Sequence, residues 1–130
     1  MTDDLPGFHF GSWSKRLMPL GRIVRVPADM RRKQTLLELL AKGLSLPEDF
    51  AWHWDSFCDC LKDLSWLDKP PQAAIVHADV PFLQHSAQRA PYFAALREAT
   101  EWWAEQGTGE LIVAFPAEDE AEVRRILENL

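Results

Sequence analysis

The sequence predicts an α/β fold, in which helices pack against a small, three-stranded parallel sheet. Short, almost continuously apolar runs at 73–76 and 111–115 predict strands that are buried on both faces. Longer segments with apolar residues at helical spacing lie between and beside these runs. Strands that alternate with helices are typical of a parallel sheet with right-handed crossovers. The 130 residues, of which 47% are apolar, are enough for one such domain and its core.

A single domain is expected to span residues 21–130, behind an N-terminal extension at 1–20. The extension contains Gly and Pro at four positions and three large aromatic rings, which predicts an irregular segment that packs through its aromatic side chains. The first strand is expected at 22–26, where β-branched residues alternate with arginine until Pro27 ends the run.

Two helical segments are expected after the first strand. The first would take Asp29 as its N-cap, run to about Lys42 and end with Gly43 at the C′ position. Ser45 and Glu48 then match a capping box with a proline in the first turn, which predicts a short helical turn.

The clearest helix is expected at 54–64, because apolar residues recur there at the i, i+3, i+7 and i+10 positions of one buried face. These residues are Trp54, Phe57, Leu61 and Leu64. Two more helices complete the fold. One is expected at 91–106 with Pro91 in its first turn, and an added C-terminal helix at 118–129 starts with acidic residues and carries basic ones later.

Charge is distributed unevenly along the chain. The formal net charge is −6, but residues 1–33 hold seven basic and three acidic side chains, a net of +4, so residues 34–130 carry −10. An acidic body repels nucleic acid and attracts a basic partner. Direct binding of nucleic acid is therefore not expected, and the partner is expected to be a protein.

The apolar runs and the cysteines exclude other classes of protein. The runs are far shorter than the roughly 20 residues that span a bilayer, so no membrane segment is expected. The acidic start of the chain lacks the pattern of a secretory signal, which favours a cytoplasmic location. Cys58 and Cys60 have neither zinc nor thioredoxin spacing and are expected to be two separate reduced thiols.

Three carboxylates mark the face opposite the apolar one on the 54–64 helix. Asp55, Asp59 and Asp63 follow one another at i, i+4 and i+8 and fall within about 80° of each other around the helix. Like charges at this spacing cost a few tenths of a kcal/mol per pair, so the arrangement is locally unfavourable. Such conflicts are more frequent at functional sites than elsewhere.

The residues around this helix strengthen the interpretation as a protein-binding surface. Residues 46–68 contain six acidic side chains and a single basic one, Lys62, and Trp52 and His53 adjoin the start of the helix. Exposed aromatic rings supply rigid contact area and carboxylates supply electrostatic steering.

Residues 46–61, LPEDFAWHWDSFCDCL, resemble the loop and second helix of the barstar-type ribonuclease inhibitors, whose pattern is roughly L-P-x-x-[YF]-G-x-N-x-D-A-[LF]-x-D-C-L. The leucine-rich segment before them and the later run from Leu96 to Ala99 also fall where this family has them. The resemblance covers about residues 22–115.

The resemblance implies a small α/β inhibitor, without catalytic activity, metal or cofactor, that blocks the active site of a cationic secreted ribonuclease inside the producing cell, as the immunity protein of a toxin–antitoxin pair. It implies that Asp59 enters the phosphate pocket of the nuclease, that Asp55 pairs with a neighbouring basic group and that Glu98 forms a peripheral ion pair. The residues expected to bind the partner are Asp49, Phe50, Trp52, His53, Asp55, Asp59 and Glu98.

This sequence departs from the family at several positions. Asp49 replaces an aromatic residue, Ala51 a glycine, His53 an asparagine and Cys58 a frequent tryptophan. The loop loses a glycine that tolerates positive φ, so its backbone path is open at this point.

Two other functions compete with inhibition. An adaptor that uses the same fold to bind another basic or toxin protein would show the same electrostatic features. A metal-dependent enzyme could use Asp55, Asp59, His53 and Glu98 as metal ligands or as an acid and base. The outer face of an amphipathic helix is convex and wet, whereas catalytic carboxylates are typical of concave, partly dry pockets, so the enzyme ranks behind the other two.

Overall fold

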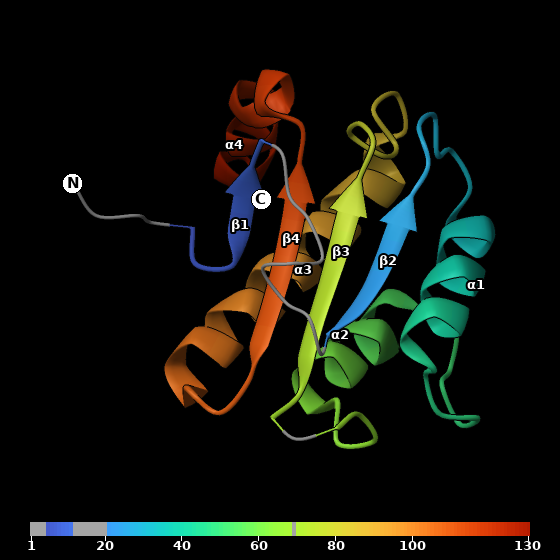
Figure 1. Ribbon diagram of the computed structural model, residues 1–130. Coiled ribbons are helices and arrows are strands. Elements are labelled where there is room, and N and C mark those ends of the chain that lie inside the picture. Colours follow the sequence, from blue (N-terminus) through green and yellow to red (C-terminus); the bar gives the residue numbers. More distant parts are fainter. Residues whose placement is uncertain (1–4, 12–20, 69) are drawn as a thin grey trace.

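The structure, a computed structural model, describes residues 5–11, 21–68 and 70–130. Its four strands form one parallel sheet in the order β1-β4-β3-β2 (Figure 1). The strands are β1 (Phe8–Phe10), β2 (Arg22–Val26), β3 (Gln72–His77) and β4 (Glu110–Phe115). The helices are α1 (Lys33–Leu44), α2 (Trp54–Asp63), α3 (Ser86–Gln106) and α4 (Glu120–Glu128), and a short 3-10 helix, η2 (Ala117–Asp119), precedes α4. The predicted α/β class, the parallel sheet and the three expected strands are confirmed.

The sheet has one strand more than predicted. Phe8–Phe10 does not form an irregular segment but pairs with β4 in parallel, with Phe8 opposite Val113 and Phe10 opposite Phe115. Ring stacking stabilises this short strand, since the Phe8 and Phe10 rings each lie 6.3 Å from that of Phe115. Three residues are too few to show a period of two in the sequence, so only the tertiary contacts reveal the strand. The rest of the predicted extension, 1–4 and 12–20, lies outside the described residues.

Helices α2 and α3 lie side by side behind the sheet in Figure 1 and bury the apolar faces predicted for them. The predicted core residues of α2, namely Trp54, Phe57, Leu61 and the following Leu64, are all buried. The inward residues of α3 and α4 are confirmed as well: Phe93, Leu96, Trp103, Val123, Ile126 and Leu127. Within the described part of the chain, no helix has the length and apolar character needed to cross a membrane.

The bounds of α1 differ from the prediction at both ends. Asp29 is not its N-cap, because α1 begins at Lys33 and Arg32 holds that position. Asp29 instead has φ +65°, and its N–H donates to both carboxylate oxygens of Asp79, at 3.1 and 3.3 Å. These bonds tie the loop after β2 to the loop after β3. Gly43 lies inside the helix rather than after it, and a Cβ there would stand 2.5 Å from a methyl group of Val24. The close approach to β2 therefore explains this glycine, and Ser45 takes the left-handed position that ends the helix.

Two further expectations about helices are corrected. Residues 45–48 form no helical turn; instead the Phe50 N–H donates to the Pro47 carbonyl at 3.0 Å and closes a tight turn. Helix α3 begins at Ser86, so Pro91 lies inside it and not in its first turn. A proline in the second turn removes one backbone hydrogen bond, and the contacts of α3 with α2 compensate for that loss.

Candidate protein-binding site

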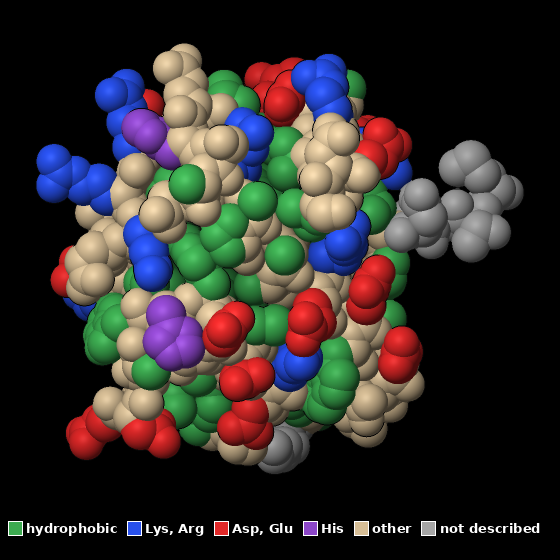
Figure 2. Space-filling view, turned by 180° about the vertical axis from the view of Figure 1, so that it is seen from behind, with side chains coloured by type: hydrophobic (Ala, Val, Ile, Leu, Met, Phe, Trp, Pro, Cys, Tyr) green, Lys and Arg blue, Asp and Glu red, His purple; other side chains and the backbone are tan. Residues whose placement is uncertain are grey.

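The outward face of α2 carries the three carboxylates that the sequence placed there. Asp55, Asp59 and Asp63 are all exposed, whereas Trp54, Phe57 and Leu61 on the opposite face are buried. Figure 2 views the molecule from this helix side and shows Asp and Glu side chains gathered over the middle and lower part, with Lys and Arg mainly above them. We call the exposed face of α2 together with the loop 46–53 the acidic surface.

The carboxylates of the acidic surface are available to a partner. Among the described residues, Asp49, Asp55, Asp59 and Asp63 have no ion pair or side-chain hydrogen bond with the rest of the chain. Their charges also affect the neighbouring Cys60. Burial is the largest cause that raises the pKa of its thiol, and the charges of Asp49, Asp63 and Asp59 raise it further. The acidic surface is thus a concentration of negative charge, and Lys62, the single basic residue of α2, pairs with Glu98.

Both cysteines of α2 are free thiols, as expected. Cys58 is buried, and its Sγ donates to the Ala95 carbonyl of α3 at 3.7 Å. Burial, followed by the nearby Glu98 charge, raises the pKa of the Cys58 thiol to about 12. A thiol that stays protonated is a poor nucleophile and a poor metal ligand, so Cys58 is a packing residue.

The loop before α2 presents one large aromatic side chain to solvent. Trp52 is 43% exposed, and its ring centroid lies 4.9 Å from that of Phe50. Phe50 itself is buried, with 5% of its surface exposed, so its ring supports Trp52 from inside and is not free to contact a partner directly. Of the two aromatic residues expected to bind, the structure places only Trp52 on the surface.

The backbone of this loop is held by hydrogen bonds to Ser56. The Ala51 N–H donates to Ser56 Oγ at 3.0 Å, and the Ser56 N–H donates to His53 Nδ1 at 3.2 Å. His53 is therefore the N-cap of α2, and its Nδ1 must carry no proton in this arrangement. Trp52, between these two bonds, has φ +61°, a conformation that costs a bulky residue on the order of 1 kcal/mol.

Among the residues expected to bind the partner, Glu98 forms an ion pair within the described part of the chain. The Lys62 Nζ of α2 donates to Glu98 Oε2 of α3 at 2.5 Å. This hydrogen bond is the main cause that lowers the pKa of Glu98 and raises that of Lys62. The Glu98 side chain is 61% exposed, so the ion pair contributes little stability and a partner could compete for the carboxylate.

The sequence was compared with models of protein families, and the model of barstar, the barnase inhibitor, matches residues 23–114. The chain belongs to the barstar family. The match covers almost the same residues as the resemblance described above, which extends over about residues 22–115. A comparison with curated proteins found no match. Barstar-family proteins are inhibitors of barnase-type ribonucleases and not enzymes, in agreement with the expectation of an inhibitor without catalytic activity.

The departures from the barstar pattern have structural consequences that can now be described. Ala51, at the position of the family glycine, does not have positive φ; the left-handed residue is its neighbour Trp52. His53, at the position of the asparagine, still caps α2. Cys58, at the position of the frequent tryptophan, faces α3 and adds nothing to the exposed face. In this chain the loop is held by Ser56 and the His53 cap, and Asp55 and Asp59 stand at the two aspartate positions of the pattern.

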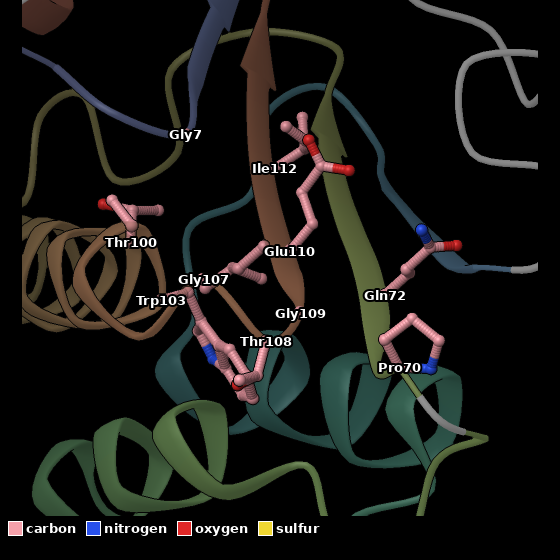
Figure 3. Close-up of a pocket in the computed structure, with 12 residues that line it drawn as sticks. Gly7, Pro70, Gln72, Thr100, Trp103, Gly107, Thr108, Gly109, Glu110 and Ile112 are labelled. Atoms are coloured by element: carbon pink, nitrogen blue, oxygen red, sulfur yellow. The ribbon is translucent and has the colours of Figure 1, made fainter.

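The described residues give no support to the metal-dependent enzyme. They contain no group of three or more His, Cys, Asp or Glu side chains that could hold a metal ion. A cavity of about 570 Å³ lies at the amino ends of β3 and β4, and Figure 3 shows Trp103, Thr100, Gln72 and Glu110 along it. None of the groups that such an enzyme was expected to use, Asp55, Asp59, His53 and Glu98, lines this cavity.

Sequence reasoning missed two residues of this site. Ser56 was not singled out, although it stands where the barstar pattern has alanine, and that substitution was the available signal. Lys62 was seen only as the single basic residue of the segment, and its bond to Glu98 needed the packing of α2 on α3.

Proposed function

We propose that this protein inhibits a basic, barnase-like ribonuclease by covering its active site with the acidic surface. The observation that carries the proposal is that Asp55 and Asp59 are exposed on one helix face and form no ion pair with any Lys or Arg of the described residues. Asp59 would occupy the pocket that binds an RNA phosphate and meet the cationic side chains there. Asp55 would pair with a neighbouring basic group, and Glu98 with a cation at the periphery.

Electrostatics support this assignment. An enzyme that binds RNA must present cations to phosphate groups, and carboxylates on a rigid helix can take the places of those phosphates. The charge of −10 on residues 34–130 would also speed the encounter with such an enzyme at low salt. Barnase with barstar is itself a standard example of this steering, so we take no magnitude from that pair.

An immunity role follows from the same proposal. A cell that makes a secreted ribonuclease must keep the enzyme inactive until it leaves, and this requires an inhibitor in the cytoplasm. We therefore place the protein in the cytoplasm, as the protective half of a toxin–antitoxin pair. We also propose that the chain divides into an extension at 1–20, which adds β1 to the sheet, and a domain at 21–130.

The decisive experiment is a titration of a basic secreted ribonuclease, ideally one encoded next to this protein and otherwise barnase. We expect RNA cleavage to fall linearly with added protein and to stop at one equivalent. Cleavage that is unaffected by an excess of the protein would contradict the proposal. Metal-dependent turnover by the protein alone, abolished by Asp59→Ala, would instead support the enzyme.

Binding to a different basic protein is a second candidate, because the exposed carboxylates of the acidic surface would attract any cationic protein in the same way. Capture from the native host followed by identification of the bound protein separates the two: a ribonuclease supports inhibition, and a basic protein without nuclease activity supports the adaptor.

Replacing Lys62 with alanine is expected to strengthen binding to a cationic ribonuclease. The change removes the only basic residue of α2 and frees the Glu98 carboxylate for the partner. We expect association to become roughly 3- to 10-fold faster at low salt, with a smaller gain at high salt because salt screens the charges. Stopped-flow association rates at two ionic strengths measure this.

Lys42→Ala is the matched control for Lys62→Ala. Lys42 is an exposed lysine in the last turn of α1, so its loss changes the net charge equally without touching the acidic surface. If both variants associate at the same rate, Lys62 has no local effect and the proposed contact of Glu98 with the partner is wrong.

A further inference from the structure

Trp52 combines exposure with an unfavourable backbone conformation. Its φ of +61° lies in the left-handed region, which bulky residues rarely adopt, and 43% of its surface is exposed. A residue held in this way persists only when its surroundings fix it, and such residues are concentrated at binding sites. The contacts that fix Trp52 are therefore of interest for the proposed function.

Both neighbours of Trp52 are bonded to the same residue, Ser56. The hydroxyl of Ser56 accepts the N–H of Ala51, and the N–H of Ser56 donates to the imidazole of His53. On the N-terminal side, the buried ring of Phe50 lies under Trp52 and the Phe50 N–H closes the turn at Pro47. The loop is thus closed around Trp52 before any partner is present.

We infer that Ser56 is a positioning residue that holds Trp52 in the conformation it has in the complex, and that Trp52 is an aromatic anchor of that complex. This inference rests on the proposed function, since it deepens the account of the same surface. A preformed loop avoids the entropy that ordering it on binding would cost, and tryptophan is among the residues that dominate binding at interface centres.

The free protein provides the first test. In Ser56→Ala the Ala51 N–H loses its acceptor, so we expect its hydrogen exchange to become at least about tenfold faster. Ser56→Thr keeps a hydroxyl and is expected to restore slow exchange. Ser65→Ala is the matched control, because Ser65 is an exposed serine just after α2 and outside the loop. Exchange at Ala51 that is equally slow in Ser56→Ala and the native protein would overturn the inference.

The complex provides the second test, with barnase or the ribonuclease of the titration as the probe. We expect Trp52→Ala and Ser56→Ala each to weaken inhibition about tenfold, and the double variant to be little weaker than Trp52→Ala alone, because Ser56 acts through Trp52. A purely structural role of Ser56 would give multiplied losses, and that result would overturn the inference while inhibition itself stands. If the native protein inhibits neither enzyme, the proposed function fails first and the anchor role fails with it.

Discussion

Replacing Asp59 with alanine is expected to weaken inhibition of the basic ribonuclease by at least about 30-fold, or about 2 kcal/mol. Asp59 lies in the middle of α2, exposed and without an ion pair in the described chain, so its carboxylate is free to enter a cationic pocket. Removing it would leave the cations of that pocket buried and unpaired in the complex, which is the costly outcome for a desolvated charge pair. Inhibition constants from RNA cleavage at fixed salt measure the loss.

Asp63→Ala is the control for Asp59→Ala. Asp63 lies on the same exposed face at the last residue of α2, nearer the rim of the acidic surface, and it carries the same charge. Both variants lose the same long-range attraction, so the difference between them reports position alone. We expect Asp63→Ala to cost less than about threefold, as rim charges do. Equal losses would mean that the acidic surface binds by general attraction and that no carboxylate enters a pocket.

Neither aspartate is expected to matter for folding. Both side chains are exposed, and removing one of two like charges at i, i+4 relieves a repulsion of a few tenths of a kcal/mol. Thermal unfolding of the two variants should therefore match or slightly exceed that of the native protein. A large drop in stability would show that the binding losses have a structural cause.

The helix α2 could be predicted from the sequence because the residues of both its faces recur at the spacing of an α-helix. Trp54, Phe57 and Leu61 recur at helical spacing, and Asp55 and Asp59 keep the same spacing on the other face. A short amphipathic helix of this kind needs no tertiary information, since burial of the apolar face decides the exposure of the other. The strands β3 and β4 could be predicted on a different ground, their short and nearly continuous apolar runs.

The features that could not be predicted depend on contacts between distant residues. β1 is stabilised by the stacking of Phe8 and Phe10 on the ring of Phe115, which is more than a hundred positions further along the chain. The early start of α3 is stabilised by Gln88, whose side-chain oxygen accepts the Trp54 indole N–H at 3.2 Å. In both places tertiary packing overrides the local signals. For β1 that signal is the Gly- and Pro-rich context, and for α3 it is a helix-breaking proline.

The loop shows why a motif alone could mislead. The missing glycine leaves the backbone path of the loop open in the sequence; in the structure Ala51 does not have positive φ, its neighbour Trp52 does, and Ser56 accepts the Ala51 N–H. A pattern written position by position does not contain these contacts. The aspartates of α2 are independent of them, because the helix itself sets their direction.

A buried histidine beneath the binding helix predicts sensitivity to acid. His77 ends β3 with 3% of its surface exposed, donates from Nδ1 to the Ala114 carbonyl at 3.0 Å and accepts at Nε2 from the Tyr92 hydroxyl at 2.7 Å. This pattern requires a neutral imidazole. Burial lowers the pKa of His77 from 6.5 to about 4, and only the bond to Ala114 opposes the shift. Tyr92 in turn contacts Trp54 and Phe57, so His77 lies under α2 through a single intermediate ring.

The direction of the pH effect depends on whether the folded or the unfolded protein has the higher pKa at His77. Between pH 6.5 and 4 the unfolded chain protonates this histidine while the folded protein does not, so protonation favours unfolding. The contribution of the neutral His77 to the free energy of unfolding is fully present above about pH 6.5. It declines as the pH falls toward 4, by on the order of 3 kcal/mol in total. Urea unfolding at pH 7 and at pH 4.5 measures the decline.

His77→Gln separates this histidine from the other acid-sensitive groups. Glutamine does not titrate, so its variant is expected to be less stable at pH 7 but to lose much less stability between pH 7 and 4.5 than the native protein. The exposed His85, replaced by glutamine in the same way, should leave the native dependence on pH intact. If His77→Gln and the native protein decline in parallel, the buried histidine is not the acid-sensitive group. If the prediction holds, the free energy that keeps α2 folded over Tyr92 declines below about pH 6.5, while His77 itself stays neutral in the folded protein until about pH 4.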